Sequence, residues 1–243
     1  MQSHDLEYHS ADGTRYVGFL ARPTAATGAA VLIAHNAPGV SDFERGVAGR
    51  LAAVGYVALC ADYIGNGDVL GMEALGPRMS PWLEDPARIR GPMQAALAAL
   101  VAQPGVDPAR VAAIGYCFGG AAALELARSG ADVAAVVGFH SSLPVNRPED
   151  ARAIRGKVLI QQGAADPMVP PDVRTLFEAQ MNAAGVDWQM HLFGGTQHAF
   201  AVPGSEAMGI PGVAYHAPSD RRSWRAMMDL FAESIDQDAA QAD

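Results

Sequence analysis

A regular alternation of short apolar runs with longer amphipathic segments is the feature that most constrains the fold of this chain. Within the apolar runs, Asp, Glu, Lys and Arg are found only at the first or last position. This is typical of strands that are buried on both faces of a sheet. The apolar runs span 29–35, 56–62, 110–116, 133–140, 157–163 and 188–193. The segments with apolar residues at helical spacing span 42–55, 85–102, 118–130, 171–185 and 220–235.

This alternation predicts an α/β protein with a mostly parallel central sheet and helices on both of its faces. Residues 7–23 contain two short strand patterns around the Asp12-Gly13 turn, which predicts an antiparallel hairpin at one edge of the sheet. Because neither a Ser/Pro-rich linker nor an internal repeat divides the 243 residues, we expect a single domain over residues 1–243.

Two stretches interrupt the alternation, near residues 64–84 and 199–219. Both are rich in Gly, Pro and Met, and long irregular loops in a compact domain tend to be functional. We therefore expect them to be irregular and to act as lids over a site. The polar tail 236–243 is expected to be frayed.

The charge and the cysteine content exclude several classes of protein. The net charge of −9, without a basic run, disfavours nucleic acid and anionic membrane surfaces as partners. Neither a secretory signal pattern nor an apolar stretch of about 18 residues is found. The two cysteines, Cys60 and Cys117, form neither a disulfide framework nor a zinc-ligand spacing, so we expect a cytoplasmic protein without a structural metal.

A cysteine stands at the turn between the run 110–116 and the helical segment that follows it. Gly115, Cys117 and Gly119 form the pattern G-x-C-x-G, which is typical of the strand-to-helix turn that carries the nucleophile of α/β-hydrolases. The helix N-terminus favours the reactive thiolate, and the N–H of Phe118 is placed to bind an oxyanion. The alternative is a structural cysteine buried in the core.

Two further candidates follow the nucleophile in the order expected of this fold. Asp166 comes directly after the run 157–163, and His198 comes after the run 188–193. Because the carboxyl ends of parallel strands meet at one edge of a sheet, both should lie near Cys117. We expect Cys117 to be the nucleophile, His198 the base and acid, and Asp166 the group that orients the histidine.

The motifs GYCFGG, GAADPMVP and QHAF, together with AHNAPGV and GFH, resemble the dienelactone hydrolase family over residues 29–235. The resemblance implies an α/β-hydrolase fold and a Cys-His-Asp triad. The activity it implies is cleavage of a small-molecule ester or lactone through a thioester, with neither a metal nor an organic cofactor. It also implies that the N–H groups of Ala37 and Phe118 form the oxyanion hole.

The sequence departs from this family at two positions. Asn36 stands where the family typically has a glutamate beside the cysteine, and asparagine cannot act as a base. Members that take dienelactone also have an arginine shortly after the catalytic histidine, and the stretch HAFAVPG that begins at His198 contains none. Arg78 and Arg88 remain as candidate partners for an anion. We therefore expect a neutral or differently shaped ester rather than dienelactone itself.

Several other residues have two interpretations. His140 ends a strand run at the expected site edge, where it would either line the pocket or bond to the backbone. Trp82, with its neighbours Leu75, Met72 and Met79, would form an apolar lid that contacts substrate or would pack on the core. Asn36, His140, Arg78 and Trp82 are thus the candidate substrate-binding residues.

Two alternatives to ester hydrolysis are open at this point. The first is a thioesterase or acyltransferase that uses the same triad. The second is a non-catalytic ligand-binding protein on the same fold, which the loss of the family glutamate at Asn36 favours.

Overall fold

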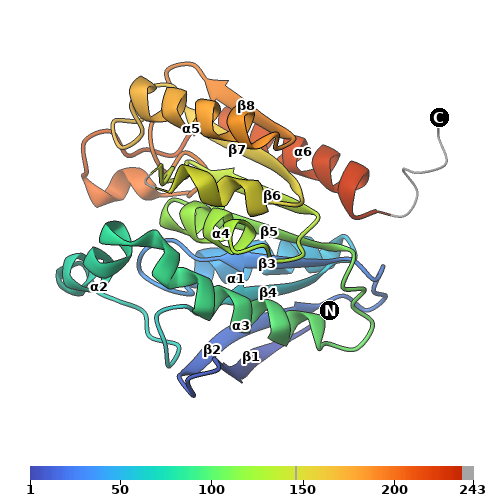
Figure 1. The fold of residues 1–243 in the computed structure, drawn as a ribbon. Helices are drawn as coiled ribbons and strands as arrows, with labels where there is room; N and C mark the ends of the chain where they lie inside the picture. Colours follow the sequence, from blue (N-terminus) through green and yellow to red (C-terminus); the bar gives the residue numbers. More distant parts are fainter. Residues whose placement is uncertain (146, 237–243) are drawn as a thin grey trace.

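An eight-stranded sheet runs through the centre of the protein in the order β1-β2-β4-β3-β5-β6-β7-β8 (Figure 1). The computed structural model describes residues 1–145 and 147–236. The strands are β1 (Gln2–His9), β2 (Arg15–Arg22), β3 (Ala30–Ala34), β4 (Val57–Ala61), β5 (Val111–Tyr116), β6 (Ala135–Phe139), β7 (Lys157–Gly163) and β8 (Trp188–Phe193). Strands β3 to β8 are parallel, so the predicted mostly parallel sheet is confirmed.

The predicted N-terminal hairpin is also confirmed. Strands β1 and β2 pair antiparallel, with Tyr8 opposite Tyr16, although β1 begins earlier than its sequence pattern suggested. Strand β2 pairs antiparallel with β4 as well, so of the two hairpin strands only β1 lies at an edge of the sheet, and β8 lies at the opposite edge.

Helices cover both faces of the sheet, as expected (Figure 1). Helices α3 (Arg90–Val101), α4 (Phe118–Arg128) and α5 (Pro171–Ala184) pack on one face, and α1 (Asp42–Ala53) and α6 (Ala217–Ser234) pack on the other. Alternate residues of each central strand point into two separate apolar layers, because successive side chains of a strand face opposite sides. Of the helices in the described ranges, none is long and apolar enough to cross a bilayer.

The first of the two expected irregular loops is partly helical, which corrects the sequence prediction. Helix α2 (Met72–Glu84) contains Pro77 and Pro81, and its N-cap provides no side-chain hydrogen bond. Internal prolines usually break a helix because they remove a backbone donor and clash with the preceding turn. Here tertiary packing overrides that preference, since the ring of Trp82 stacks on the ring of Phe118 at 5.9 Å.

The remaining connections are short or irregular. In the described part of the chain they contain three 3₁₀ helices, η1 (Pro86–Ile89), η2 (Pro148–Ala153) and η3 (Ser205–Met208). The second expected loop, 199–219, contains η3 and the first residues of α6 and has no other helix. The prediction of a frayed tail at 236–243 concerns residues that, apart from Asp236, lie outside the described part of the chain.

The topology brings the loops after β3 and β5 side by side. The chain runs from β3 through α1 to β4 on one side, and then returns to place β5 on the other side of β3. Ala34, the last residue of β3, therefore lies in register with Gly115. In open parallel sheets, ligands bind in the crevice formed where the strand order reverses in this way.

Candidate active site

Cys117 occupies a strained turn between β5 and α4. Its backbone angles are φ 54° and ψ −119°, a region that residues with a side chain rarely adopt. Three backbone hydrogen bonds hold this conformation. The N–H of Cys117 donates to the carbonyl of Phe139 at 3.0 Å, and its carbonyl accepts from the N–H groups of Gly120 at 3.1 Å and Ser142 at 3.0 Å.

The glycines of the motif are required because backbone segments approach closely around the turn. A Cβ atom on Gly115 would lie 2.0 Å from the carbonyl oxygen of Gly119, and one on Gly119 would lie 2.2 Å from that of Ala34. Any side chain at either position would push α4 away from β3 and β5. The G-x-C-x-G pattern thus follows from the packing of the nucleophile turn.

The structure brings together the three residues that the sequence order singled out. The Nε2 atom of His198 lies 3.1 Å from the Sγ atom of Cys117, and its Nδ1 atom lies 2.8 Å from Oδ2 of Asp166. His198 and Asp166 are each 3% exposed, so water screens their interaction poorly. A thiol, an imidazole and a carboxylate in this arrangement can generate a nucleophile and move its proton.

Asp166 is held by a residue that the sequence analysis missed. Gln162, from β7, donates from Nε2 to Oδ2 of Asp166 at 2.7 Å, and the backbone N–H of Met168 donates to Oδ1 at 2.8 Å. Both oxygens of the buried carboxylate are therefore fixed. The only sequence signal was an unusual pair of glutamines at the end of an otherwise apolar strand run.

The second expected loop fixes the backbone of His198. Its N–H donates to the carbonyl of Gly212 at 2.9 Å, and its carbonyl accepts from the N–H of Ala214 at 3.0 Å. These two bonds form an isolated parallel bridge between His198 and Val213. The segment that follows His198 therefore fixes its backbone, while Asp166 and Cys117 fix its ring.

The environment of His198 favours its protonated form. Burial lowers the pKa of the imidazole, but the hydrogen bonds and charges of Asp166 and Cys117 outweigh burial and raise the pKa from 6.5 to about 10. His198 is therefore an imidazolium at neutral pH, held between a carboxylate and the cysteine sulfur. This is the arrangement in which a histidine can donate a proton to a leaving group.

The loop after β3 contains Ala37 and is fixed by Glu44, which the sequence analysis also missed. Glu44, a fully buried residue of α1, accepts from the N–H of Asn36 at 3.1 Å and from the N–H and hydroxyl of Ser41 at 2.9 and 2.5 Å. Burial raises the pKa of Glu44, and the hydrogen bonds from Ser41 and Asn36 oppose this effect. The S-x-x-E spacing of a capping box was the available sequence signal.

The N–H groups of Ala37 and Phe118 are free to bind an oxyanion. Within residues 1–145 and 147–236, neither N–H has a hydrogen-bond acceptor. Phe118 is the first residue of α4, where N–H groups are left without intrahelical partners and the helix dipole favours negative charge.

A cavity of about 270 Å³ lies over the cysteine, and its surface is almost entirely apolar. Both expected lid stretches contribute to it, the first through Leu75 and the second through a longer set of residues: Ala199, Val202, Met208, Ile210 and Val213. Cys117, His198, Asn36 and His140 also line this cavity, which we call the nucleophile cavity.

His140 is an uncharged polar group in the wall of the nucleophile cavity. It is fully buried, has a positive φ of 38°, and its ring lies edge-on to that of His198 at 5.1 Å. Burial and the charge of His198 lower the pKa of His140 well below its usual value. Neither ring nitrogen has a partner among the described residues, so the ring is not bonded to backbone, which was one of the two interpretations.

The other two candidate substrate-binding residues lie outside the nucleophile cavity. Arg78 donates a hydrogen bond to the carbonyl of Ile64 and does not line the cavity. Trp82 packs on Phe118 and on Tyr63, and it faces a different cavity. Arg88 is exposed and lies 4.0 Å from Asp85. Among the described residues, no Lys or Arg side chain lines the nucleophile cavity.

Neither a metal site nor a disulfide accompanies these groups in the part of the chain that the structure describes. Among residues 1–145 and 147–236, no group of three or more His, Cys, Asp or Glu side chains is arranged to hold a metal ion. Cys60 is a free thiol buried in β4, where it donates to the carbonyl of Glu44 at 3.2 Å, so it belongs to the core.

Comparison with known proteins gives consistent matches over most of the chain. The model of the dienelactone hydrolase family matches residues 17–235. The solved structure of m3DLH is 42% identical, with a TM-score of 0.92 over 96% of this chain and 98% of that one. The dienelactone hydrolase-like promiscuous phosphotriesterase P91, from metagenomic libraries, is 38% identical, with a TM-score of 0.89 over the same shares. The carboxymethylenebutenolidase of Pseudomonas sp. (strain P51) is 31% identical over 186 residues, which are 72% of this chain and 76% of that protein.

Proposed function

The chain belongs to the dienelactone hydrolase family, has the α/β-hydrolase fold and is an ester or lactone hydrolase, and on this basis we propose that Cys117, His198 and Asp166 are its catalytic triad. The reaction then passes through a thioester on Cys117. The observation that carries the proposal is the continuous line of contacts from Asp166 through His198 to the sulfur, at 2.8 and 3.1 Å.

In the first half of the reaction, the thiolate of Cys117 attacks the carbonyl carbon of the ester. A C–S bond forms, and the π electron pair moves to the carbonyl oxygen, where the N–H groups of Ala37 and Phe118 bind it. In comparable enzymes, each such N–H donor stabilises the transition state by about 3 kcal/mol. When the C–O bond to the alcohol breaks, the imidazolium of His198 gives its proton to the leaving oxygen.

In the second half, water hydrolyses the thioester. Neutral His198 takes a proton from water while the water oxygen attacks the carbonyl carbon, and the C–S bond then breaks to release the carboxylic acid. The thiolate and the imidazolium are restored. Asp166 keeps the imidazole in one tautomer and orientation throughout, as Gln162 and the N–H of Met168 keep Asp166 fixed.

We also propose that the preferred substrate is neutral around the scissile bond. The nucleophile cavity is apolar and has no cationic side chain among the described residues, so a substrate carboxylate would lose its hydration without a partner. The uncharged ring of His140 and the amide of Asn36 are the polar groups beside the triad that remain to hydrogen-bond a neutral ester. Asn36 cannot remove the thiol proton, so thiolate formation falls to His198 and the N-terminus of α4.

Hydrolysis of p-nitrophenyl acetate tests the triad. Wild type and Cys60→Ala, in which the other thiol is removed, should release p-nitrophenol with equal kcat/KM. Cys117→Ala should lose activity to near the uncatalysed rate, because the nucleophile is gone. Equal rates in wild type and Cys117→Ala would refute the proposal, and the absence of turnover in all three proteins with a range of esters would favour the ligand-binding alternative.

Adding an alcohol to the same assay separates hydrolysis from acyl transfer. If water accepts the acyl group, the free acid should be the main product at every alcohol concentration. An ester of the added alcohol as the main product would instead assign the triad to an acyltransferase.

A second candidate activity is supported by one relative. The promiscuous phosphotriesterase P91 is 38% identical over 96% of this chain, and a phosphotriester is a neutral substrate that suits an apolar cavity. Hydrolysis of a p-nitrophenyl phosphotriester by wild type, abolished in Cys117→Ala, would establish this activity on the same nucleophile.

A further inference from the structure

A second cavity, of about 380 Å³, is lined by Phe118, the residue that follows Cys117. Its volume falls in the range of about 300–1,000 Å³ that is usual for small-molecule sites. The residues that form it include Trp82 and Leu83 of α2, Phe118 and Ala121 of α4, and Val173 of α5. We call it the distal cavity. None of the side chains that line it, among the described residues, is charged.

The two cavities share one wall. Met168 lines both, and its side chain is half exposed, unbranched and therefore adaptable. Phe118 adjoins Cys117 in the chain and presents its ring to the distal cavity, where it stacks on Trp82. A group that extends from a carbonyl carbon at Cys117 past Met168 would reach the distal cavity.

One wall of the distal cavity, formed by residues 142–145, is held by a buried arginine. Arg128 of α4 is buried and donates from Nη1 to the carbonyl of Pro144 at 2.8 Å. Gln180 of α5 accepts from Arg128 at 3.3 Å and donates to the carbonyl of Val145 at 2.7 Å. The wall is thus tied to two helices.

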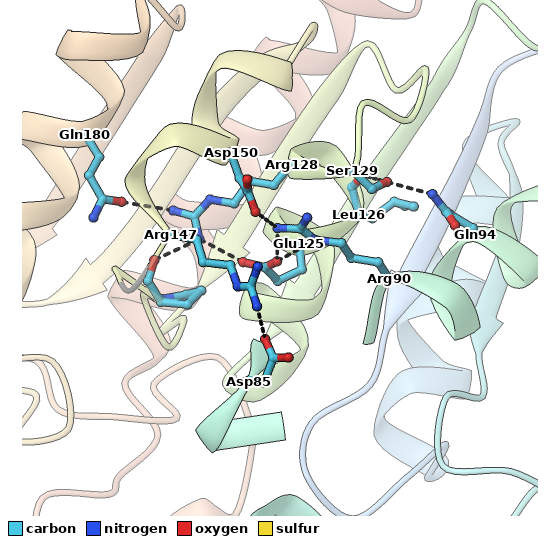
Figure 2. Close-up of polar contacts among 11 residues, drawn as sticks. Asp85, Arg90, Gln94, Glu125, Leu126, Arg128, Ser129, Arg147, Asp150 and Gln180 are labelled. Atoms are coloured by element: carbon cyan, nitrogen blue, oxygen red, sulfur yellow. Dashed lines mark hydrogen bonds and ion pairs between the residues drawn. The ribbon is translucent and has the colours of Figure 1, made fainter. Parts of the chain in front are cut away.

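The charge of Arg128 is balanced by a network of ion pairs that contains Glu125, Arg90 and Asp150 (Figure 2). Glu125, 1% exposed, binds Arg128 at 2.9 Å and Arg90 at 2.7 Å, and Arg90 also binds Asp150 at 2.5 Å. Arg147, two residues after Val145, binds Asp85 at the end of α2 at 3.0 Å. The distal cavity therefore has a preformed wall.

The direction of the reaction decides which half of the substrate each cavity holds. The leaving oxygen of the ester must lie near Nε2 of His198. His198 and residues of the segment 199–213 that follows it line the nucleophile cavity. The carbonyl oxygen must lie near the N–H groups of Ala37 and Phe118. The third substituent of the carbon, the acyl group, then points away from His198 and toward Phe118 and the distal cavity.

We propose that the distal cavity is the acyl-binding site and that it takes uncharged apolar acyl groups, such as medium-chain alkanoyl groups or aryl carboxylic acyl groups. The inference rests on the proposed function, because it takes Cys117 as the nucleophile. The alcohol half of the ester occupies the nucleophile cavity. Met168 separates the two halves of the substrate.

The test uses p-nitrophenyl esters that differ only in the acyl chain, from acetate to octanoate. Ala121→Phe and Val173→Phe each fill the distal cavity, from α4 and α5 respectively. Each should lower the octanoate-to-acetate ratio of kcat/KM about tenfold or more, since removing room for methylene groups has effects of this size. Leu176→Phe, on the exposed face of α5 and outside both cavities, is the matched control and should leave the ratio unchanged.

A parallel series of acetate esters with longer alcohols should respond to none of the three substitutions. An unchanged acyl-length ratio in Val173→Phe, which lies far from the nucleophile turn in the chain, would overturn the proposal. A change in the alcohol series instead would overturn it as well, because the cavity would then hold the leaving group.

Binding of p-nitrophenyl octanoate to Cys117→Ala, measured by calorimetry, gives a readout that does not depend on turnover. Adding Val173→Phe to this variant should weaken binding about tenfold, and adding Leu176→Phe should not. Equal affinities with and without Val173→Phe would refute the acyl site. Failure of Cys117→Ala to abolish hydrolysis would refute the triad instead, so the two failures are distinct.

Discussion

At the scale of single residues, His198 combines opposing influences on its proton. Burial disfavours the charge, while Asp166 and Cys117 favour it and raise the pKa from 6.5 to about 10. An imidazolium that persists through neutral pH is ready to protonate a leaving alcohol, which is the step that our mechanism assigns to it.

The pH dependence of kcat/KM follows from this pKa. We expect activity to persist through neutral pH and to fall above about pH 10, where His198 loses the proton that it must donate. In Asp166→Asn the fall should move to lower pH, because the carboxylate that raises the pKa of His198 is gone. An unchanged alkaline limb in Asp166→Asn, measured with an alkyl acetate whose leaving alkoxide must be protonated, would contradict the assignment.

The same proton contributes to stability with a defined sign. A histidine whose pKa is higher in the folded state stabilises the fold fully below its unfolded pKa of 6.5, and this contribution is lost as the pH rises through about 10. The free energy of unfolding, measured in urea, should therefore fall between these values in wild type. The free energy of unfolding should fall less over this pH range in His198→Gln. Equal decreases in the two proteins would contradict the raised pKa of His198.

Some residues of the site could be predicted from sequence and others could not. The elbow motif and the positions after strand runs led to Cys117, Asp166 and His198 because those signals are local. Gln162 and Glu44 act through contacts with Asp166 and the loop after β3, so their roles became visible only in three dimensions.

At the scale of elements, α1 fixes the loop that contains one of the proposed oxyanion donors. Glu44→Gln keeps the shape but replaces one acceptor oxygen with a donor, so at least one of its bonds to Asn36 and Ser41 is lost. We expect kcat to fall about tenfold with little change in KM, and stability to fall by about 1 kcal/mol. Steady-state kinetics and urea unfolding measure the two effects.

The matched control for this prediction is Asp42→Asn, on the same first turn of α1 but exposed. It should leave kcat unchanged. If Glu44→Gln raised KM and left kcat unchanged, the loop would serve substrate binding rather than transition-state stabilisation.

Helix α2 shows where element prediction from sequence fails. Gly76, Pro77 and Pro81 argue locally for a loop, and the structure has a helix because its Trp82 packs on Phe118 and Tyr63. The strand runs, by contrast, were predictable because their apolar composition reflects burial on both faces of the sheet, a requirement that every residue of the run shares.

At the scale of the whole molecule, the ion pairs around Glu125 connect α3, α4 and the segment that contains η2. Glu125→Gln leaves the buried charge of Arg128 without its partner, and we expect a loss of stability of about 3–5 kcal/mol in urea unfolding. The matched control is Glu7→Gln, which removes the half-exposed pair with Arg15 and should change stability by about 1 kcal/mol or less.

Similar losses for Glu125→Gln and Glu7→Gln would contradict a stabilising role for the buried network. Sequence analysis could not have found this network, because its members are separated by up to 60 residues and look like ordinary helix-surface charges in the sequence. The sheet could be predicted because strand and helix alternate along the chain. The antiparallel pairing of β2 with β4 depends on contacts that the alternation does not specify.

The most direct test of the central claim is detection of the acyl group on Cys117. Wild type would be mixed with p-nitrophenyl octanoate, quenched with acid within the first turnover, and analysed by intact mass and peptide mapping. We predict one octanoyl group, on the peptide that contains Cys117, which hydroxylamine removes and which is absent in Cys117→Ala. Turnover at full rate with the acyl group on another residue, or with the same adduct in Cys117→Ala, would contradict the account.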